Sequence, residues 1–253
     1  MRYIPVTGDI QAGKSTFADT IETLHGSAIH IETFEIIAEV ATQFNKSFHP
    51  EHGTPVERIN HWLGQMPGVL KKVLDIDVNY GDITISQKHI EAEPAAYVKM
   101  FGFLSLLDSK TNIARQKITS DNKEKYRPEL QWIGGHLVSR VDKNIWFKEV
   151  VRRAEAEESR GVDLCITTAV KYKSDELYMR TFEGTVIPKI VRAELPTRDA
   201  TDPTERESSL VTPDTILYNN GDLAQYKNSI EQFYKDYIDG TVQSAYVAND
   251  STE

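Results

Sequence analysis

The chain has 253 residues, of which 40% are hydrophobic and 26% are charged, and its formal net charge is −9. This length suits one large α/β domain with insertions or two small domains. The acidic balance argues against broad binding to DNA or RNA but leaves a small nucleotide open as a ligand. A lone cysteine, Cys165, excludes an intrachain disulfide, and no apolar run approaches the ~20 residues of a membrane span. We therefore expect a cytoplasmic protein that does not contact membranes.

The first predicted element is a buried strand over 2–7, which leads directly into a glycine loop. Residues 8–16 read Gly-Asp-Ile-Gln-Ala-Gly-Lys-Ser-Thr and match the pattern G-x-x-x-x-G-K-[ST]. Apolar residues at helical spacing follow as far as Leu24. Strand, glycine loop and helix form the context in which this pattern binds phosphate. The alternative, a plain glycine turn with an exposed lysine and serine, fits these flanks less well.

The residue types in this loop suit a nucleotide phosphate group and its magnesium ion. Glycines let backbone N–H groups turn inward around an anion, and the following helix directs its positive end at the same place. Lys14 can reach the β- and γ-phosphates, and the Ser15 hydroxyl can hold Mg²⁺. The predicted phosphate-binding residues are Gly8, Asp9, Gln11, Ala12, Gly13, Lys14, Ser15 and Thr16.

Four further segments have the apolar character of strands: 28–32, 162–168, 185–191 and 215–219. Pro188 weakens the third of these as a central strand. Helical patterns lie between the strands, one capped by Asp142, one running from Ser174 through Phe182 and one capped by Asp222. Strands that alternate with helices predict an α/β fold with a mostly parallel five-stranded sheet, whose ligands bind beyond the carboxyl ends of the strands.

Residues 45–126 do not follow this rhythm. They include a predicted β-hairpin over 76–85 and an apolar helix over 95–107. We interpret 45–126 as an insertion that forms a substrate-side subdomain. The expected organisation is a single domain over 1–238, with a candidate lid over 192–208 and a flexible tail over 239–253.

Beyond the loop, three pieces of the sequence follow one another in a recognisable order. Residues 127–136 read Arg-Pro-Glu-Leu-Gln-Trp-Ile-Gly-Gly-His and precede a Trp-containing helix. The strand over 162–168 precedes a basic-aromatic pair and an acidic helix start, and residues 216–223 contain an Asn-Asn-Gly turn. Together with the N-terminal strand, loop and helix, these pieces resemble the P-loop nucleoside monophosphate kinases, and within them the phage-type deoxynucleoside monophosphate kinases.

The resemblance implies a P-loop NTPase-like three-layer sandwich that transfers phosphate from ATP, with Mg²⁺, to a deoxynucleoside 5′-monophosphate. It implies catalytic roles for Lys14, Arg127, Lys171 and Arg192, substrate contacts from Glu32, Arg127, Gln131 and Lys171, and a metal contact from Ser15. Outside the loop, each of these has a plain alternative as a surface side chain. The implied partner is a small nucleotide, in the host cytoplasm if the protein is phage-encoded, and a homodimer is one option.

Departures from the family pattern keep other functions open. Ala169 stands where the family has a carboxylate, and Lys171 stands where it has an arginine, so a bidentate contact is lost. Residues 32–37 are acidic where the family has a lysine. One alternative is a P-loop kinase for another acceptor, including a modified base in DNA. The other is a catalytically inactive nucleotide-binding protein.

Overall fold

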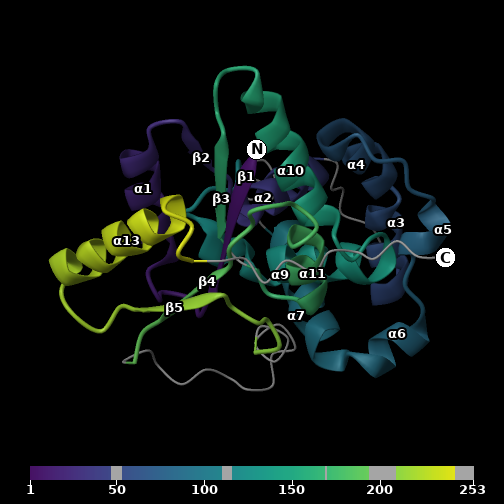
Figure 1. Ribbon diagram of the computed structural model, residues 1–253. Coiled ribbons are helices and arrows are strands. Elements are labelled where there is room, and N and C mark those ends of the chain that lie inside the picture. The colour runs from purple at the N-terminus through teal and green to yellow at the C-terminus, as the bar shows by residue number, and fades with distance from the viewer. Residues whose placement is uncertain (47–52, 110–115, 169, 194–208, 243–253) are drawn as a thin grey trace. The chain divides into compact units, whose positions relative to one another are not determined.

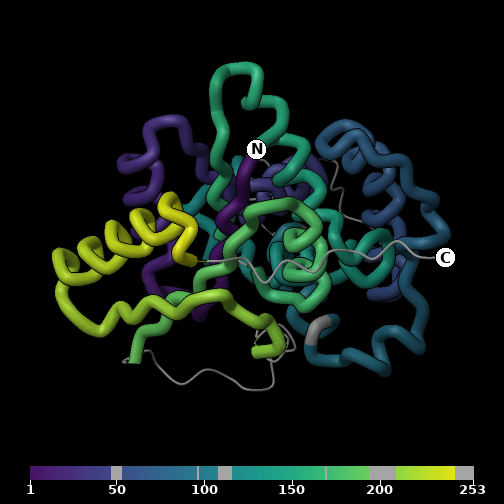
Figure 2. The backbone as a smooth tube through the Cα atoms, viewed as in Figure 1, coloured from purple at the N-terminus to yellow at the C-terminus, as the bar shows by residue number. Residues whose placement is uncertain are grey.

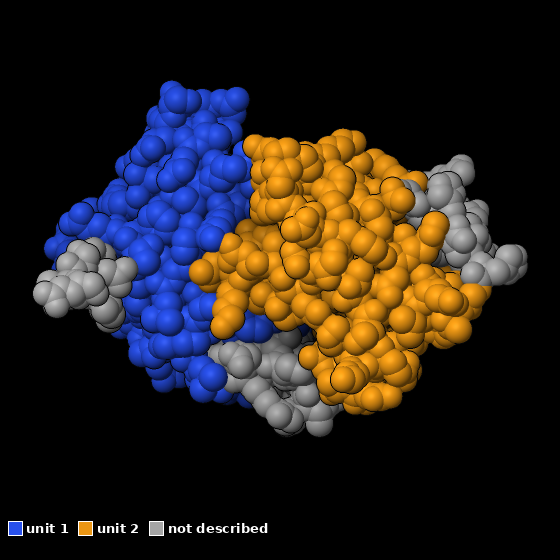
Figure 3. Space-filling model, turned by 90° about the vertical axis from the view of Figure 1, so that its right-hand side faces the viewer, with its two compact units in different colours: residues 1–33, 147–253 blue, residues 34–146 orange. Residues whose placement is uncertain are grey.

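The computed structural model describes residues 1–46, 53–109, 116–168, 170–193 and 209–242. The chain divides into two compact units, residues 1–33 with 147–253 and residues 34–146, which Figure 3 colours separately. The first unit holds the sheet and the glycine loop, and the second is built from helices.

The first unit contains a five-stranded sheet in which all the described strands run parallel (Figure 1). Its order is β2-β3-β1-β4-β5. The strands are β1 (Arg2–Gly8), β2 (Ala28–His30), β3 (Leu164–Thr168), β4 (Pro188–Val191) and β5 (Thr215–Tyr218). All five predicted strands are confirmed, and the α/β architecture is compatible with a P-loop-like sandwich.

The strand β1 occupies the centre of this sheet, where apolar side chains are buried on both faces. Its residues Tyr3 to Thr7 are all buried. It pairs with β3 from Arg2 to Val6 and then with β4 at Thr7 and Gly8. Pro188, which weakened the sequence prediction of β4, is the first residue of that strand, where a missing N–H group interrupts the ladder least.

Helices cover both faces of this sheet (Figure 1). On one face, α1 (Lys14–His25) and α13 (Leu223–Ile238) pack together over a core that includes Ile4, Phe17 and Phe233. Because side chains alternate along a strand, Tyr3 points to the opposite face, where its ring lies 4.9 Å from that of Phe182. Phe182 follows α11 (Lys173–Met179). Burial raises the pKa of Tyr3, and Glu155 and Glu158 of α10 (Ile145–Glu158) act in the same direction.

The predicted helix starts agree with the structure more closely than the predicted ends. Asp222 caps α13, because its Oδ1 accepts a hydrogen bond from the Gln225 N–H at 2.8 Å. The second predicted helix begins at Lys173 but ends at Met179, three residues before Phe182. The chain turns there and reaches Gly184, whose φ of 74° is in the left-handed region that glycine adopts without strain.

The described residues of the second unit are mostly helical. The helices are α2 (Thr33–Lys46), which begins at the end of the first unit, and α3 (Pro55–Leu63), α4 (Met66–Leu74), α5 (Tyr80–Ile83), α6 (Gln87–Ala92), α7 (Pro94–Ser109) and α9 (Lys123–Arg140). The helix predicted over 95–107 is confirmed by α7.

The β-hairpin predicted over 76–85 is wrong, because this segment contains the short helix α5 and no strand. The side-chain amide of Asn60 takes the place of a partner strand for Ile85. Its Nδ2 donates to the Ile85 carbonyl, and its Oδ1 accepts from the Ile85 N–H, both at 2.9 Å. Ile83 and Ile85 are therefore buried although this segment forms no β-ladder.

A stack of near-parallel rings lies in the core of the second unit. Phe44 stacks on Trp62 at 4.0 Å between ring centroids, and Trp132 stacks on His136 at 4.4 Å. Burial lowers the pKa of His136 to about 4, and its Nε2 lies 2.8 Å from the Ile83 carbonyl. The neutral ring can donate this hydrogen bond, so His136 acts as a core residue.

Candidate functional site

The glycine loop leaves the carboxyl end of β1 and enters α1 at Lys14. Gly8 and Gly13 have φ angles of 135° and 108°, which L-residues rarely adopt. Neither position has room for a side chain. A Cβ on Gly8 would overlap the Ile190 carbonyl oxygen, and a Cβ on Gly13 would lie 2.5 Å from Nδ2 of Asn219. Both glycines of the motif are therefore required by this backbone path.

Lys14 folds back over the loop that precedes it. Its Nζ donates hydrogen bonds to the carbonyl oxygens of Gly8 at 2.7 Å and Asp9 at 2.6 Å. The loop is closed further by the Ala12 N–H, which donates to the Asp9 carbonyl at 3.2 Å. A helix leaves its first N–H groups without partners inside the helix, so the start of α1 adds backbone donors beside this ammonium group. The arrangement offers positive charge and N–H donors to an anion.

The Ser15 hydroxyl and the Glu32 carboxylate lie together next to the loop. Ser15 Oγ donates to Glu32 Oε1 at 3.4 Å, and Glu32 follows the carboxyl end of β2. His30 Nε2 lies 3.7 Å from the same carboxylate oxygen. A hydroxyl and a carboxylate are the hard oxygen ligands that Mg²⁺ prefers, so these two residues fit a magnesium ion bound with a nucleotide phosphate.

Lys171 and Arg192 follow the carboxyl ends of β3 and β4, at the same edge of the sheet as the loop. The segment before Lys171 contacts β1 directly, because the Val170 N–H donates to the Val6 carbonyl at 3.2 Å. Thr7 Oγ1 also donates to the Val170 carbonyl at 3.0 Å. Arg192 is exposed. The connection from β1 runs toward β2, whereas that from β4 runs toward β5. Ligands of parallel sheets bind where neighbouring strands have connections that run in opposite directions, so this edge suits a ligand.

Asp175 organises the turn that contains Lys171. Its Oδ2 accepts hydrogen bonds from the N–H groups of Tyr172 at 2.9 Å and Lys171 at 3.2 Å. Burial raises the pKa of Asp175 to about 7, although these two N–H groups and the Lys171 charge act in the opposite direction. Between about pH 4 and pH 7, the folded protein therefore keeps a proton on Asp175 that the unfolded chain, with a pKa of 3.8, has already released.

We expect the free energy of unfolding to contain a contribution from Asp175 that is fully present below about pH 4 and lost as the pH rises through about 7. Asp175→Asn should remove this contribution, which has a slope of at most about 1.4 kcal/mol per pH unit. Denaturant titrations between these pH values measure it, with the exposed Asp121→Asn as the control. Equal pH slopes for Asp175→Asn and the wild type would contradict this assignment.

Gly13→Ala should destabilise the protein more than a change at another glycine with positive φ. Gly161 has a φ of 88°, and no described atom lies within 4 Å of the place that a methyl group would take, so Gly161→Ala should cost only backbone strain of about 1–2 kcal/mol. Gly13→Ala must also displace Asn219 and the ring of Tyr226, which adds roughly 1–3 kcal/mol. Chemical denaturation of both variants tests the difference, and equal losses would show that the loop has room for a methyl group.

Arg127 and Gln131 lie in the second unit, one turn apart on α9. Gln131 is exposed. The Arg127 guanidinium donates to the Glu124 carboxylate of the same helix through Nε at 2.7 Å and Nη2 at 2.5 Å. The Glu124 carboxylate therefore occupies the position on the Arg127 guanidinium that the predicted role gives to an acceptor phosphate.

Two residues that contact the loop were missed by the sequence prediction of the site. Asn219 Nδ2 donates to the Ala12 carbonyl at 2.8 Å, and the Tyr226 hydroxyl donates to the Gly13 carbonyl at 3.1 Å. The Asn-Asn-Gly turn was noted for its resemblance alone, and no pattern links it to a loop more than 200 residues earlier in the chain. Ala169, most of the candidate lid over 192–208 and most of the tail over 239–253 lie outside the described residues.

No family model matches this sequence, and no curated protein matches it. Among the described helices, none combines the length and apolar character that crossing a membrane requires.

Proposed function

We propose that the protein transfers the γ-phosphoryl group of ATP to a deoxynucleoside 5′-monophosphate. The observation that carries this proposal is the Lys14 ammonium group, folded over the carbonyl oxygens of Gly8 and Asp9 at the carboxyl end of the central strand. A cation at this position, with the N–H groups that begin α1, suits the phosphates of a nucleoside triphosphate. The proposed fold is accordingly a P-loop NTPase-like three-layer sandwich.

In the proposed reaction, a phosphate oxygen of the monophosphate attacks the γ-phosphorus of ATP. The bond between that phosphorus and the bridging oxygen of the β-phosphate breaks, which yields ADP and a deoxynucleoside diphosphate. Such a transfer needs alignment of two phosphates and neutralisation of their charge more than covalent catalysis. Lys14 is assigned to the β- and γ-phosphates, and Lys171 and Arg192, at the same edge of the sheet, to the transferring group.

Ser15 and Glu32 are assigned to the magnesium ion, as hydroxyl and carboxylate ligands. When bound, the ion would neutralise phosphate charge as the γ-phosphoryl group moves. Because the Glu32 carboxylate accepts a hydrogen bond from the Ser15 hydroxyl at 3.4 Å, it holds that side chain beside the loop. Arg127 and Gln131 remain the candidates for the acceptor phosphate and base.

The test is a phosphorylation assay with ATP, Mg²⁺ and each of dAMP, dGMP, dCMP, dTMP and dUMP, together with 5-hydroxymethyl variants, followed by chromatographic separation. A diphosphate product from one or a few of these acceptors is the expected result, and its identity names the accepted base. Absence of a diphosphate with every acceptor, in a preparation that binds ADP, would contradict the proposal.

A second candidate is a nucleotide-binding protein without turnover. The Arg127–Glu124 ion pair favours it, because a guanidinium engaged by a carboxylate is less available to an acceptor phosphate. Glu124→Gln separates the two candidates. If the pair restrains a kinase, this change should lower the KM for the monophosphate, whereas a protein without turnover gains no product.

A further inference from the structure

Two side chains from the C-terminal part of the chain hold successive carbonyl groups of the glycine loop. Asn219 Nδ2 donates to the Ala12 carbonyl at 2.8 Å, and the Tyr226 hydroxyl donates to the Gly13 carbonyl at 3.1 Å. The Phe17 N–H is a second donor to the Gly13 carbonyl, at 3.0 Å. The tight fit at Gly13, where a Cβ would lie 2.5 Å from Asn219 Nδ2 and 3.0 Å from a ring carbon of Tyr226, shows how closely both residues approach the loop.

A planar trans peptide points its N–H group away from its carbonyl group. When Asn219 fixes the Ala12 carbonyl, it also fixes the direction of the Gly13 N–H, and when Tyr226 fixes the Gly13 carbonyl, it fixes that of the Lys14 N–H. Each hydrogen bond therefore directs the opposite end of its peptide away from Asn219 and Tyr226. These are the two N–H groups that lead into the start of α1, where an anion would bind.

We infer that Asn219 and Tyr226 are positioning residues that aim the N–H groups of Gly13 and Lys14 at the phosphates of the bound nucleotide. The inference rests on the proposed phosphate site. Preorganised donors are worth more than donors that must reorient when the ligand arrives, because the cost of orientation is met during folding. Loss of either hydrogen bond should therefore weaken phosphate binding while Lys14 and its charge are retained.

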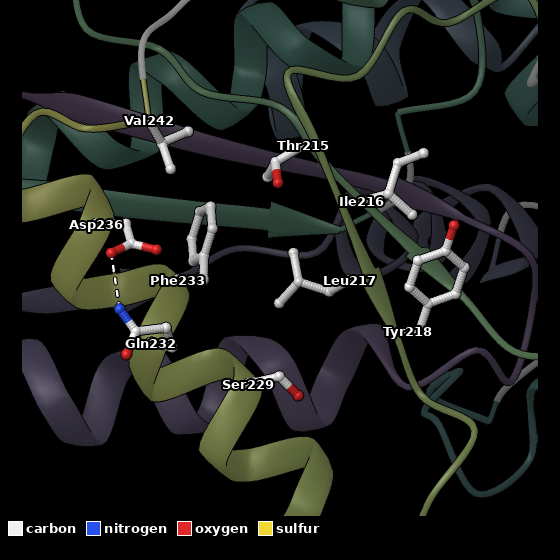
Figure 4. Close-up of a pocket in the computed structure, with 9 residues that line it drawn as sticks. All are labelled: Thr215, Ile216, Leu217, Tyr218, Ser229, Gln232, Phe233, Asp236 and Val242. Atoms are coloured by element: carbon white, nitrogen blue, oxygen red, sulfur yellow. Dashed lines mark hydrogen bonds between the residues drawn. The ribbon is translucent and has the colours of Figure 1, made fainter.

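The framework behind these two residues is hydrogen-bonded and packed into the core. Asn219 follows β5, and its N–H donates to the Val191 carbonyl at 2.8 Å, which continues the ladder between β4 and β5. The chain then turns into α13 (Figure 2), whose first turn is closed by Asp222 and Gln225. Figure 4 shows Phe233 of α13 and Leu217 of β5 between helix and strand, and both belong to the hydrophobic core. Tyr226 is 2% exposed, and burial raises its pKa, so its hydroxyl stays a donor.

The groove between β5 and α13 that Figure 4 displays has a volume of about 450 Å³ and is separate from this contact. It is lined by residues of β5, of α13 after Tyr226 and by Val242, and none belongs to the glycine loop. The positioning contact lies instead at the carboxyl end of β5 and the first turn of α13.

The experiment compares Tyr226→Phe and Asn219→Ala with matched controls from α13. Tyr237→Phe is the tyrosine control, because the buried Tyr237 hydroxyl has no hydrogen-bond partner among the described residues, and Asn228→Ala is an exposed asparagine control. Calorimetric titration with ADP and with inorganic pyrophosphate gives the dissociation constants. Selective ¹⁵N labelling of glycine and lysine follows the Gly13 and Lys14 N–H groups when pyrophosphate is added.

We expect Tyr226→Phe to weaken binding of both ligands about 2- to 5-fold and Asn219→Ala about 5- to 10-fold, because the Gly13 carbonyl keeps the Phe17 donor. Both changes should reduce the pyrophosphate-induced shifts of the Gly13 and Lys14 N–H signals, an effect that general destabilisation does not produce. The controls should match the wild type. If Asn219→Ala does not fold, Tyr226→Phe alone decides, since it keeps the ring.

Two results would overturn the inference, and they differ from each other. If the wild type binds pyrophosphate and Tyr226→Phe binds it as Tyr237→Phe does, with unchanged N–H shifts, the aiming role is wrong while the phosphate site stands. If the wild type binds neither ADP nor pyrophosphate, the proposed function fails together with the inference.

Discussion

Lys14→Ala should lower the rate of nucleotide phosphorylation about 10²- to 10³-fold, the loss expected when one preorganised donor to the transferring group is removed. The ammonium group folded over Gly8 and Asp9 is the charge assigned to the β- and γ-phosphates. The change leaves the glycine backbone and the Ser15–Glu32 contact in place. We therefore expect kcat to fall while the melting temperature changes little. Initial rates with saturating ATP and monophosphate measure it.

The control for this prediction is Lys227→Ala, which removes an exposed lysine from α13 and should leave the rate unchanged. Purified Lys14→Ala must be folded, which circular dichroism and the melting temperature establish. A Lys14→Ala rate within about twofold of the wild-type rate would show that the phosphoryl transfer occurs elsewhere or that another cation serves the phosphates.

Arg180→Met should destabilise the protein by about 3–5 kcal/mol, because it removes the buried guanidinium that pairs with both Glu176 and Asp214. The Arg180 side chain is 4% exposed and joins α11 to the segment before β5. Its Nε donates to Glu176 at 3.1 Å, and its Nη1 donates to both oxygens of Asp214 at 3.0 and 3.2 Å. Chemical denaturation at neutral pH measures the loss of unfolding free energy.

The pKa of Glu176 supports the view that Arg180 pairs with charged carboxylates. Burial alone would raise that pKa, but the Lys173 ammonium, the Thr212 N–H and the Arg180 guanidinium outweigh burial and lower it. The carboxylate is therefore charged in the folded protein, and the stability that it contributes is lost as the pH falls below its ordinary value of 4.5.

Arg160→Met is the matched control for Arg180→Met, since Arg160 pairs with Glu157 on the surface and should cost between zero and about 1 kcal/mol. A triple variant that combines Arg180→Met with Glu176→Gln and Asp214→Asn should recover part of the lost stability, because no buried charge remains unpaired. If Arg180→Met costs no more than Arg160→Met, the buried cluster does not hold α11 to this segment.

The centre of the sheet could be predicted from the sequence because β1 and β3 are buried on both faces. Continuous apolar runs mark β1 and β3, and their alternation with helices indicates parallel pairing. The strand order could not be predicted, since it depends on contacts between distant segments. The hairpin over 76–85 failed for a related reason, because a single side-chain amide, that of Asn60, supplies the hydrogen bonds that a second strand would supply.

The candidate site likewise has a part that could be predicted from the sequence and a part that could not. The loop from Gly8 to Ser15 could be predicted, because its glycines are required by local φ angles and its lysine by its position at the helix start. Asn219 and Tyr226 could not, because their role depends on β5 and α13 being placed beside the loop by the completed sheet. Likewise, only the structure shows the ion pair between Arg127 and Glu124.

The most direct test of phosphoryl transfer is ³¹P NMR of the wild-type protein with ATP, Mg²⁺ and a mixture of the five deoxynucleoside monophosphates. The proposal predicts that ADP and a deoxynucleoside diphosphate appear in equal amounts, without inorganic phosphate. Release of ADP with an equal amount of inorganic phosphate, or ATP signals that broaden on binding but persist without turnover, would contradict it.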